Sequence, residues 1–198
     1  MGIVQTAYSE TTQEFLQFLK LEKDYSSDSL DILEEGKSRY LADLKLNFKN
    51  SFESEYLTKK EIALLGIALS VNAGNALLKE FFRNNAIEES ASAEEIAEAV
   101  ACASLLSANN VFYRFRHFVG KEKYNEIPAR IKMNIMGRPV NGKEFFELIS
   151  LAVSAVNGCE MCVKSHENSL IELGSKEERI FEAVRLSAVI TSVSKVIF

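Results

Sequence analysis

The sequence predicts an all-α fold. Apolar residues recur at spacings of three and four along most of the 198 residues, and the strict alternation of half-buried strands is nearly absent. Glycine (9) and proline (2) are scarce, which favours long helices over many short strands joined by tight turns. Hydrophobic residues make up 47% of the chain and charged residues 26%, the balance of an ordinary globular protein. We therefore expect one helical domain over residues 1–198.

Seven segments carry the helical pattern. In chain order they are 10–30, 30–50, 59–84, 92–118, 143–156, 158–173 and 175–197. The clearest is "SAEEIAEAVACASLLSANN", where Ser92 suits the N-cap position and acidic residues follow in the first turn. Near the end of the chain, Gly174 closes one helix and Ser175 opens the next.

Two stretches lie outside this main set of helices. The first 40 or so residues, acidic at "SSDSLDILEEG", are expected to form a helical extension that packs on the core or contacts a neighbouring subunit. The segment "YRFRHFVGKEKYNEIPARIKMNIMGRPVNG", residues 113–142, is expected to cross the surface as a connector.

Two parts of the chain resemble each other. The stretch "IALSVNAGNALLKEFF" aligns with "LAVSAVNGCEMCVKSH" when Asn72 is placed opposite Asn157. This similarity predicts two related halves, at about 59–118 and 143–198, because a short helical unit buries its apolar face by packing on a copy of itself. In this alignment the second half carries the reactive side chains and the first does not: Gly74 faces Cys159, Leu77 faces Cys162 and Phe81 faces His166.

Charge and composition exclude several classes of function. The formal net charge is −5 and no block of Lys and Arg stands out, so a nucleic-acid or anionic-membrane partner is not expected. The opening "MGIVQTAYSE" lacks the features of a signal peptide, and no apolar run reaches the roughly 18–20 residues of a membrane span. Three cysteines do not form a disulfide framework, so we expect a reducing cytoplasm, where a Cys-x-x-Cys pair is more often catalytic or metal-binding.

The stretch "NGCEMCVKSH" holds the reactive side chains. Asn157-Gly158 breaks one helix, which places Cys159 in the first turn of the next. Cys159, Cys162 and His166 are spaced i, i+3 and i+7 and therefore share one helical face. Cysteines at this spacing can close a disulfide, and the helix N-terminus favours a thiolate. Dithiol–disulfide exchange needs this thiolate, a second sulfur and a group that moves the proton.

The preceding helix offers a carboxyl group. The stretch "FFELISLAVSAV" is apolar almost all round, and Glu147 is its single charge. A buried carboxylate needs a proton or a partner. In an antiparallel hairpin that breaks at Asn157-Gly158, Glu147 reaches the level of His166, which predicts a Glu–His–Cys proton relay.

Plainer interpretations remain open for the same residues. The cysteine pair can be structural or accidental, or can bind zinc, although a closed zinc site needs four ligands and no second Cys/His pair is present. A c-type haem is excluded because Val163 follows the second cysteine where a histidine is required. Cys102 is expected to be a small core residue and His117 a solvated surface residue.

The residues also resemble a known family. The stretch "FELISLAVSAVNGCEMCVKSHENSL" is similar to the signature of the AhpD proteins, the alkyl hydroperoxide reductase D components within the carboxymuconolactone decarboxylase-like superfamily. The resemblance extends through "NNVFYRFRHF" and "RIKMNIMGRPV", more loosely through "LKLNF", and covers about residues 40–195. It implies an all-α homotrimer that binds no cofactor, has weak hydroperoxidase activity and reduces the peroxiredoxin AhpC. It further implies that dihydrolipoyl groups of a dihydrolipoamide acyltransferase re-reduce the disulfide, with dihydrolipoamide dehydrogenase and NADH as the source of electrons.

The resemblance also implies a role for each site residue. Cys162 becomes the nucleophile that forms a sulfenic acid, Cys159 the proton donor and resolving thiol, and His166 and Glu147 members of the relay. The family pattern has histidine just before the second cysteine, where this chain has Met161, so the relay must work without that imidazole. Helix-dipole reasoning alone favours Cys159 as the attacking thiolate, but we follow the family in assigning attack to Cys162.

Two hypotheses follow from the sequence. The first is a thiol antioxidant enzyme that reduces alkyl hydroperoxides directly or through AhpC. The alternative is a non-redox protein of the same fold, either carboxymuconolactone decarboxylase-like or a binding scaffold with an idle dithiol. The absence of the cysteine pair from the first half argues for the redox hypothesis.

Overall fold

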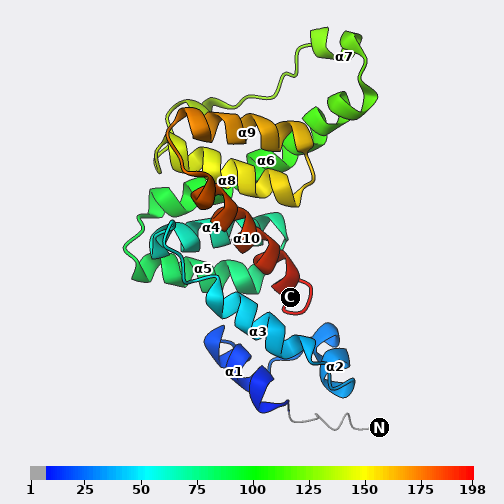
Figure 1. Ribbon diagram of the computed structural model, residues 1–198, viewed down its shortest axis with the longest axis vertical. Helices are drawn as coiled ribbons and strands as arrows, with labels where there is room; N and C mark the ends of the chain where they lie inside the picture. The colour runs from blue at the N-terminus through cyan, green and yellow to red at the C-terminus, as the bar shows by residue number, and fades with distance from the viewer. Residues whose placement is uncertain (1–7) are drawn as a thin grey trace.

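Helices account for all the regular structure of residues 8–198, the part of the chain that the computed structural model describes, and no strand occurs there (Figure 1). The prediction of an all-α fold is therefore confirmed. Residues 1–7, the start of the expected N-terminal extension, lie outside the described residues. The elements are α1 (Glu10–Phe18), α2 (Asp28–Glu35), α3 (Tyr40–Asn50), α4 (Lys59–Asn72), α5 (Ala76–Glu88), α6 (Ala93–Val119), α7 (Glu122–Glu126), the 3₁₀ helix η1 (Asn134–Gly137), α8 (Lys143–Val156), α9 (Glu160–Glu172) and α10 (Glu177–Val193).

Three of the predicted helical segments are wrong in their extent: 10–30, 30–50 and 59–84. The segment expected at 59–84 is two helices, because Gly74 adopts φ +69° and the side chain of Asn75 then caps the Leu78 N–H at 2.9 Å. The N-terminal 10–50 is three short helices rather than two. Its breaks include Lys20 and Lys37, which both adopt a left-handed conformation.

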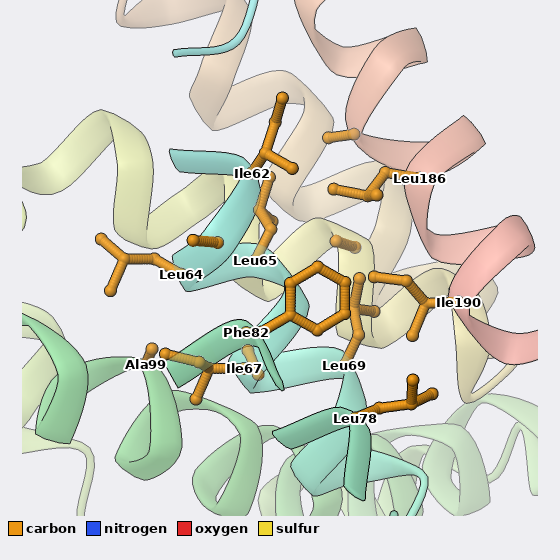
Figure 2. Packing of buried hydrophobic residues seen from close by; sticks show 14 of the residues in the cluster. Ile62, Leu64, Leu65, Ile67, Leu69, Leu78, Phe82, Ala99, Leu186 and Ile190 are labelled. Atoms are coloured by element: carbon orange, nitrogen blue, oxygen red, sulfur yellow. The ribbon is translucent and has the colours of Figure 1, made fainter. Parts of the chain in front are cut away.

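The hydrophobic core is centred on α4, which is apolar on nearly every face and is surrounded by α5, α6, α8 and α10. Figure 2 shows the ring of Phe82 lying among the α4 side chains Leu65 and Leu69 and the α10 side chain Ile190. The fit is close at Gly66, where an added Cβ would lie 2.2 Å from Cδ1 of Phe82. Glycine is therefore required at this position for α4 and α5 to approach each other.

The N-terminal helices are attached to the core by aromatic packing. Six phenylalanine rings form one cluster with centroid separations of 5.1 to 6.0 Å: Phe15, Phe18, Phe48, Phe52, Phe81 and Phe82. The Ser27 hydroxyl donates to the main-chain oxygen of Val196 at 2.5 Å and fixes the C-terminal tail against α2. In Figure 1, α1–α3 lie at one end of the long axis, and the connector that carries α7 lies at the other.

The connector between the two halves is exposed, as predicted. None of the residues from 111 to 142 is buried, although the last residues of α6 occupy the start of this range. Its end is anchored by the buried carboxylate of Glu98, which accepts the main-chain N–H groups of Val140 at 2.6 Å and Asn141 at 2.7 Å. Because Glu98 lies on α6, this contact determines where α8 begins relative to the first half.

The helix boundaries correct the alignment of the two halves. Three pairs of helices begin 84 residues apart: Lys59 with Lys143, Ala76 with Glu160, and Ala93 with Glu177. The 85-residue offset that places Asn72 opposite Asn157 is therefore wrong for the helices. With the 84-residue offset, the residues opposite Cys159, Cys162 and His166 are Asn75, Leu78 and Phe82. We refer to α4–α6 as the first half and to α8–α10 as the second half.

No helix within residues 8–198 combines the length and the apolar character needed to cross a bilayer.

Candidate functional site

The turn between α8 and α9 places the first cysteine. Gly158 adopts φ +65°, its N–H bonds to the Ala155 carbonyl at 3.1 Å, and the Cys159 N–H bonds to the Ser154 carbonyl at 3.1 Å. This is the double hydrogen-bond pattern of a left-handed helix C-terminus, for which glycine is the favoured residue. Cys159 is also the N-cap residue of α9, whose first helical residue is Glu160, so one residue ends one helix and begins the next.

The two cysteines of this turn are joined in a disulfide bond, and their Cα atoms are 5.3 Å apart. Cys162 is the third residue of α9, so both sulfurs lie at the N-terminal end of a helix, where the dipole favours negative charge. Cys159 has no exposed surface, whereas Cys162 is 7% exposed. Of the two sulfur-bearing side chains, that of Cys162 is therefore the more accessible from solvent.

The predicted contact between Glu147 and His166 is present. Oε2 of Glu147 lies 2.6 Å from Nδ1 of His166, and both side chains are 11% exposed. Glu147 comes from the second turn of α8 and His166 from the middle of α9, so the antiparallel hairpin brings together residues 19 apart in sequence. A carboxylate bonded to one ring nitrogen fixes the orientation of an imidazole. This hairpin therefore holds a buried acid–imidazole pair whose imidazole lies one turn of α9 beyond Cys162.

The other residues singled out from the sequence lie where they were expected. Cys102 has no exposed surface, and burial raises the pKa of its thiol to about 12. Its sulfur lies 3.4 Å from the Ser150 hydroxyl of α8, so it packs as a core residue. His117 is largely solvated, with Nε2 3.7 Å from a carboxylate oxygen of Glu160, and Met161 is partly exposed. No group of three or more His, Cys, Asp or Glu side chains in residues 8–198 is arranged to hold a metal ion.

Sequence reasoning missed a polar network behind the cysteine turn. The side-chain amides of Asn72 and Asn157 bond each other at 2.9 and 3.1 Å, and Asn157 also donates to the Asn110 amide oxygen at 2.9 Å. The guanidinium of Arg114 donates to the main-chain oxygen of Asn157. The sequence held one indication of this network, because the alignment of the two halves paired Asn72 with Asn157. These two residues are in contact, although they are not equivalent positions of the two halves.

Comparison with known proteins identifies the family. A model of the carboxymuconolactone decarboxylase family matches residues 125–197. The alkyl hydroperoxide reductase AhpD of Anaeromyxobacter sp. (strain K) is 40% identical over 162 residues, which cover 82% of this chain and 87% of that protein. The AhpD of Beijerinckia indica is 37% identical over 164 residues, 83% of this chain and 91% of its own length, and that of Coxiella burnetii (strain Dugway 5J108-111) is 36% identical over 161 residues, 79% and 90%. The chain belongs to the AhpD family.

Membership of the AhpD family agrees with the placement of the site. The segment matched by the carboxymuconolactone decarboxylase model begins in the last residues of α7, ends beyond α10, and contains both cysteines, Glu147 and His166. The similarity to the AhpD relatives is longer, because about 162 aligned residues also include part of the first half. The relationship therefore extends beyond the cysteine motif to the scaffold that holds it.

Proposed function

We propose that the protein is a thiol-dependent alkyl hydroperoxide reductase that cycles Cys159 and Cys162 between dithiol and disulfide. The observation that carries this proposal is the hairpin itself, which unites a closed Cys-x-x-Cys disulfide with a buried Glu147–His166 pair. A disulfide that served only stability would need no acid–imidazole pair on the same two helices. The names of the AhpD relatives supply the substrate class.

The proposed reaction has two steps. In the first, the Cys162 thiolate attacks the outer peroxide oxygen, an S–O bond forms as the O–O bond breaks, and the departing alkoxide takes a proton to become an alcohol. In the second, the Cys159 sulfur attacks the sulfenic acid, the disulfide forms and water leaves. We assign proton transfer in both steps to Cys159 and to His166, which Glu147 orients. The greater exposure of Cys162 supports its role as the attacking sulfur.

The same dithiol would reduce AhpC. Exchange converts the AhpC disulfide to two thiols while this chain acquires the Cys159–Cys162 disulfide, so the electron count balances. Dihydrolipoyl groups of a dihydrolipoamide acyltransferase then return the chain to its dithiol state. Dihydrolipoamide dehydrogenase reduces the resulting lipoyl disulfides again with electrons from NADH. In this scheme the protein holds no cofactor of its own. A cytoplasmic location is part of the proposal, because the cycle needs these partners in one compartment.

A homotrimer is the assembly we propose, and the end of α6 offers a surface for it. Exposed apolar side chains recur there at spacings of four and three and continue into the connector: Val111, Phe115, Phe118, Tyr124 and Ile127. Phe118 is 73% exposed, and the rings of Phe115 and Tyr124 pack with centroids 5.2 Å apart. A patch of this kind on a protein is typically covered by a partner, here further copies of the chain. Sedimentation of the Phe118→Glu variant should show a smaller species than the wild type.

A reconstituted assay tests the reaction. NADH oxidation is followed with peroxide, AhpC, the acyltransferase and the dehydrogenase present, and each component is omitted in turn. Cys162→Ser is expected to reduce the rate to that measured without the protein, because the remaining Cys159 is fully buried and cannot close the disulfide alone. Cys102→Ala is the matched control, since Cys102 is the one cysteine outside the pair, and it should retain turnover. Equal rates with Cys162→Ser and wild type would contradict the proposal.

A thiol titration separates this proposal from the non-redox alternative. The reduced protein is treated with a small excess of alkyl hydroperoxide, and its thiols are counted before and after. Loss of two thiols per chain together supports the redox cycle. Retention of all three thiols supports a carboxymuconolactone decarboxylase-like protein or a binding scaffold with an idle dithiol. Metal analysis of the same sample tests the zinc interpretation.

A further inference from the structure

Asn157 is held by residues of the first half on every side of its amide. Its side-chain oxygen accepts from Asn72 at 2.9 Å, and its side-chain nitrogen donates to Asn72 at 3.1 Å and to Asn110 at 2.9 Å. Asn110 is fully buried and donates in turn to the Ser154 hydroxyl at 2.9 Å. The network runs from part-buried Asn72 and Asn157 to fully buried Asn110 and Ser154, and it favours one geometry, because displacing Asn157 would leave the buried Asn110 oxygen without this partner.

Arg114 holds the main chain at the same point. Its guanidinium donates to the carbonyl oxygen of Asn157, the C-cap residue of α8, whose carbonyl has no acceptor role within the helix. Arg114 lies on α6 and Asn110 one turn before it, so a single helix of the first half binds both the side chain and the backbone of Asn157. The peptide that Arg114 binds is the one that enters the Gly158 turn.

From these contacts we infer that Arg114 and Asn157 are positioning residues for the dithiol. Cys159 lies two residues beyond Asn157, and its N–H is bonded to Ser154, which the same network holds. With the turn fixed, the Cys159 sulfur stays close to Cys162 after reduction, so closing the disulfide costs little chain entropy. Releasing the turn lowers the effective concentration of one sulfur at the other. The first half, which lacks the Cys-x-x-Cys pair, thus sets the redox poise of the second half.

The inference rests on the proposed function, but its test needs neither peroxide nor AhpC. The protein is equilibrated with glutathione buffers, in which the dithiol and oxidised glutathione exchange to give the disulfide and two molecules of reduced glutathione. For Arg114→Met we expect the equilibrium constant for disulfide formation to fall about tenfold, a reduction potential about 30 mV higher. Asn157→Ala should shift it in the same direction. Arg114→Lys keeps one donor and should recover part of the difference.

Arg116→Met is the matched control. Arg116 lies on the same helix and also donates to a main-chain oxygen, that of Ile127, which belongs to the connector and not to the cysteine turn. The Arg116→Met variant should be less stable to urea, but the reduction potential of its cysteine pair should equal that of the wild type. A wild-type potential in Arg114→Met, or an equal shift in Arg116→Met, would overturn the inference. Failure of the proposed function would give a different result. Arg114→Met would still shift the potential relative to wild type, but peroxide would consume no thiols in the titration.

Discussion

The two halves of the molecule have the same order of helices, with matching starts, and differ in the side chains at equivalent positions. Their helices begin 84 residues apart throughout, and the turns after α4 and α8 both contain a left-handed glycine, with φ +69° at Gly74 and +65° at Gly158. The chemistry of the second half comes from four substitutions on this plan, listed as first half and second half: Ala63 and Glu147, Asn75 and Cys159, Leu78 and Cys162, Phe82 and His166. The candidate site therefore lies on a helical hairpin, α8–α9, whose helix lengths match those of α4–α5.

The first half shows what the second half loses by carrying the cysteines. Asn75 caps α5 through a 2.9 Å bond from the Leu78 N–H, whereas Cys159 makes no such side-chain cap for α9. An N-cap residue contributes about 0.5–2 kcal/mol, so the second half gives up some helix stability for a reactive pair. Phe82 likewise fills the core, whereas its equivalent His166 is held by a hydrogen bond to Glu147.

Converting the second half to the residues of the first should have the largest effect. In the Cys159→Asn/Cys162→Leu variant we expect peroxide turnover and AhpC reduction to fall to the background rate, since neither sulfur remains. The fold should persist, because Asn and Leu occupy the same backbone in α5. Urea unfolding should give a free energy no lower than that of the reduced wild-type protein, as the new asparagine adds a cap. A variant that fails to fold would show that the two hairpins are not interchangeable.

Removing the charge of the buried acid should have the next largest effect. Glu147→Gln keeps the shape and one hydrogen bond to His166 but removes the carboxylate from the proposed proton relay, so turnover should fall about 100-fold, the usual range for loss of general acid–base assistance. Glu144→Gln is the control, because Glu144 lies on the same helix but bonds Arg179, away from the cysteines. Equal turnover in wild type and Glu147→Gln would remove Glu147 from the relay.

The sequence was sufficient for the contacts that follow from helical periodicity. The meeting of Glu147 with His166 was predictable, because a break at Asn157-Gly158 and the helical repeat place both residues at one level of an antiparallel hairpin. The burial of Cys102 followed from its small, apolar surroundings in "AVACASLL". These predictions depend only on local spacing and on one turn.

The contacts that sequence reasoning missed depend on tertiary structure. Arg114 bonds a main-chain oxygen, which any residue could provide, so no pattern in the sequence marks Asn157 as its partner. The left-handed conformations of Lys20 and Lys37 could not be predicted from the sequence either, since lysine is not a residue type that favours them. The stretches around Asn72 and Asn157 were aligned one residue out of register. These two asparagines are in contact in the fold, but they do not occupy equivalent positions in the two halves.

Close packing of the first half gives a smaller, purely structural prediction. Gly66→Ala places a Cβ 2.2 Å from Phe82, so the variant should lose about 2–3 kcal/mol of unfolding free energy through overpacking. The equivalent position in the second half is Ser150, which is fully buried and already carries a side chain. Gly137→Ala is the control, because nothing lies within 4 Å of its added Cβ. Urea denaturation measures both, and equal stabilities would mean that Phe82 can move aside without cost.

The smallest effects are expected at two ion pairs that occupy equivalent positions in the two halves, with the positive and negative residues exchanged. Lys60 of α4 bonds Glu95 of α6 at 2.7 Å, and at the same two positions of the second half Glu144 of α8 bonds Arg179 of α10 at 2.8 Å. Arg179 also bonds Glu61 at 2.5 Å, so it joins the starts of three helices, and its side chain is 16% exposed against 38% for Lys60. We expect Arg179→Met to cost about 1–2 kcal/mol, between the values for exposed and buried pairs, and Lys60→Met about 0.5 kcal/mol.

Low pH should remove the stability difference between wild type and Arg179→Met. Burial raises the pKa of the Glu144 and Glu61 carboxyls, but hydrogen bonds from Arg179, helped by Ser175 at Glu144 and Thr58 at Glu61, outweigh it and leave both below the usual 4.5. A carboxyl whose pKa is lowered on folding stabilises the protein above its unfolded pKa, and this contribution is lost as the pH falls through the folded pKa. The stability gap between wild type and Arg179→Met should therefore be full at pH 6–7 and narrow below about pH 4.5, where both carboxyls take up protons. Urea unfolding at several pH values measures this gap, and a gap that stays constant down to pH 3 would show that Arg179 contributes by packing alone.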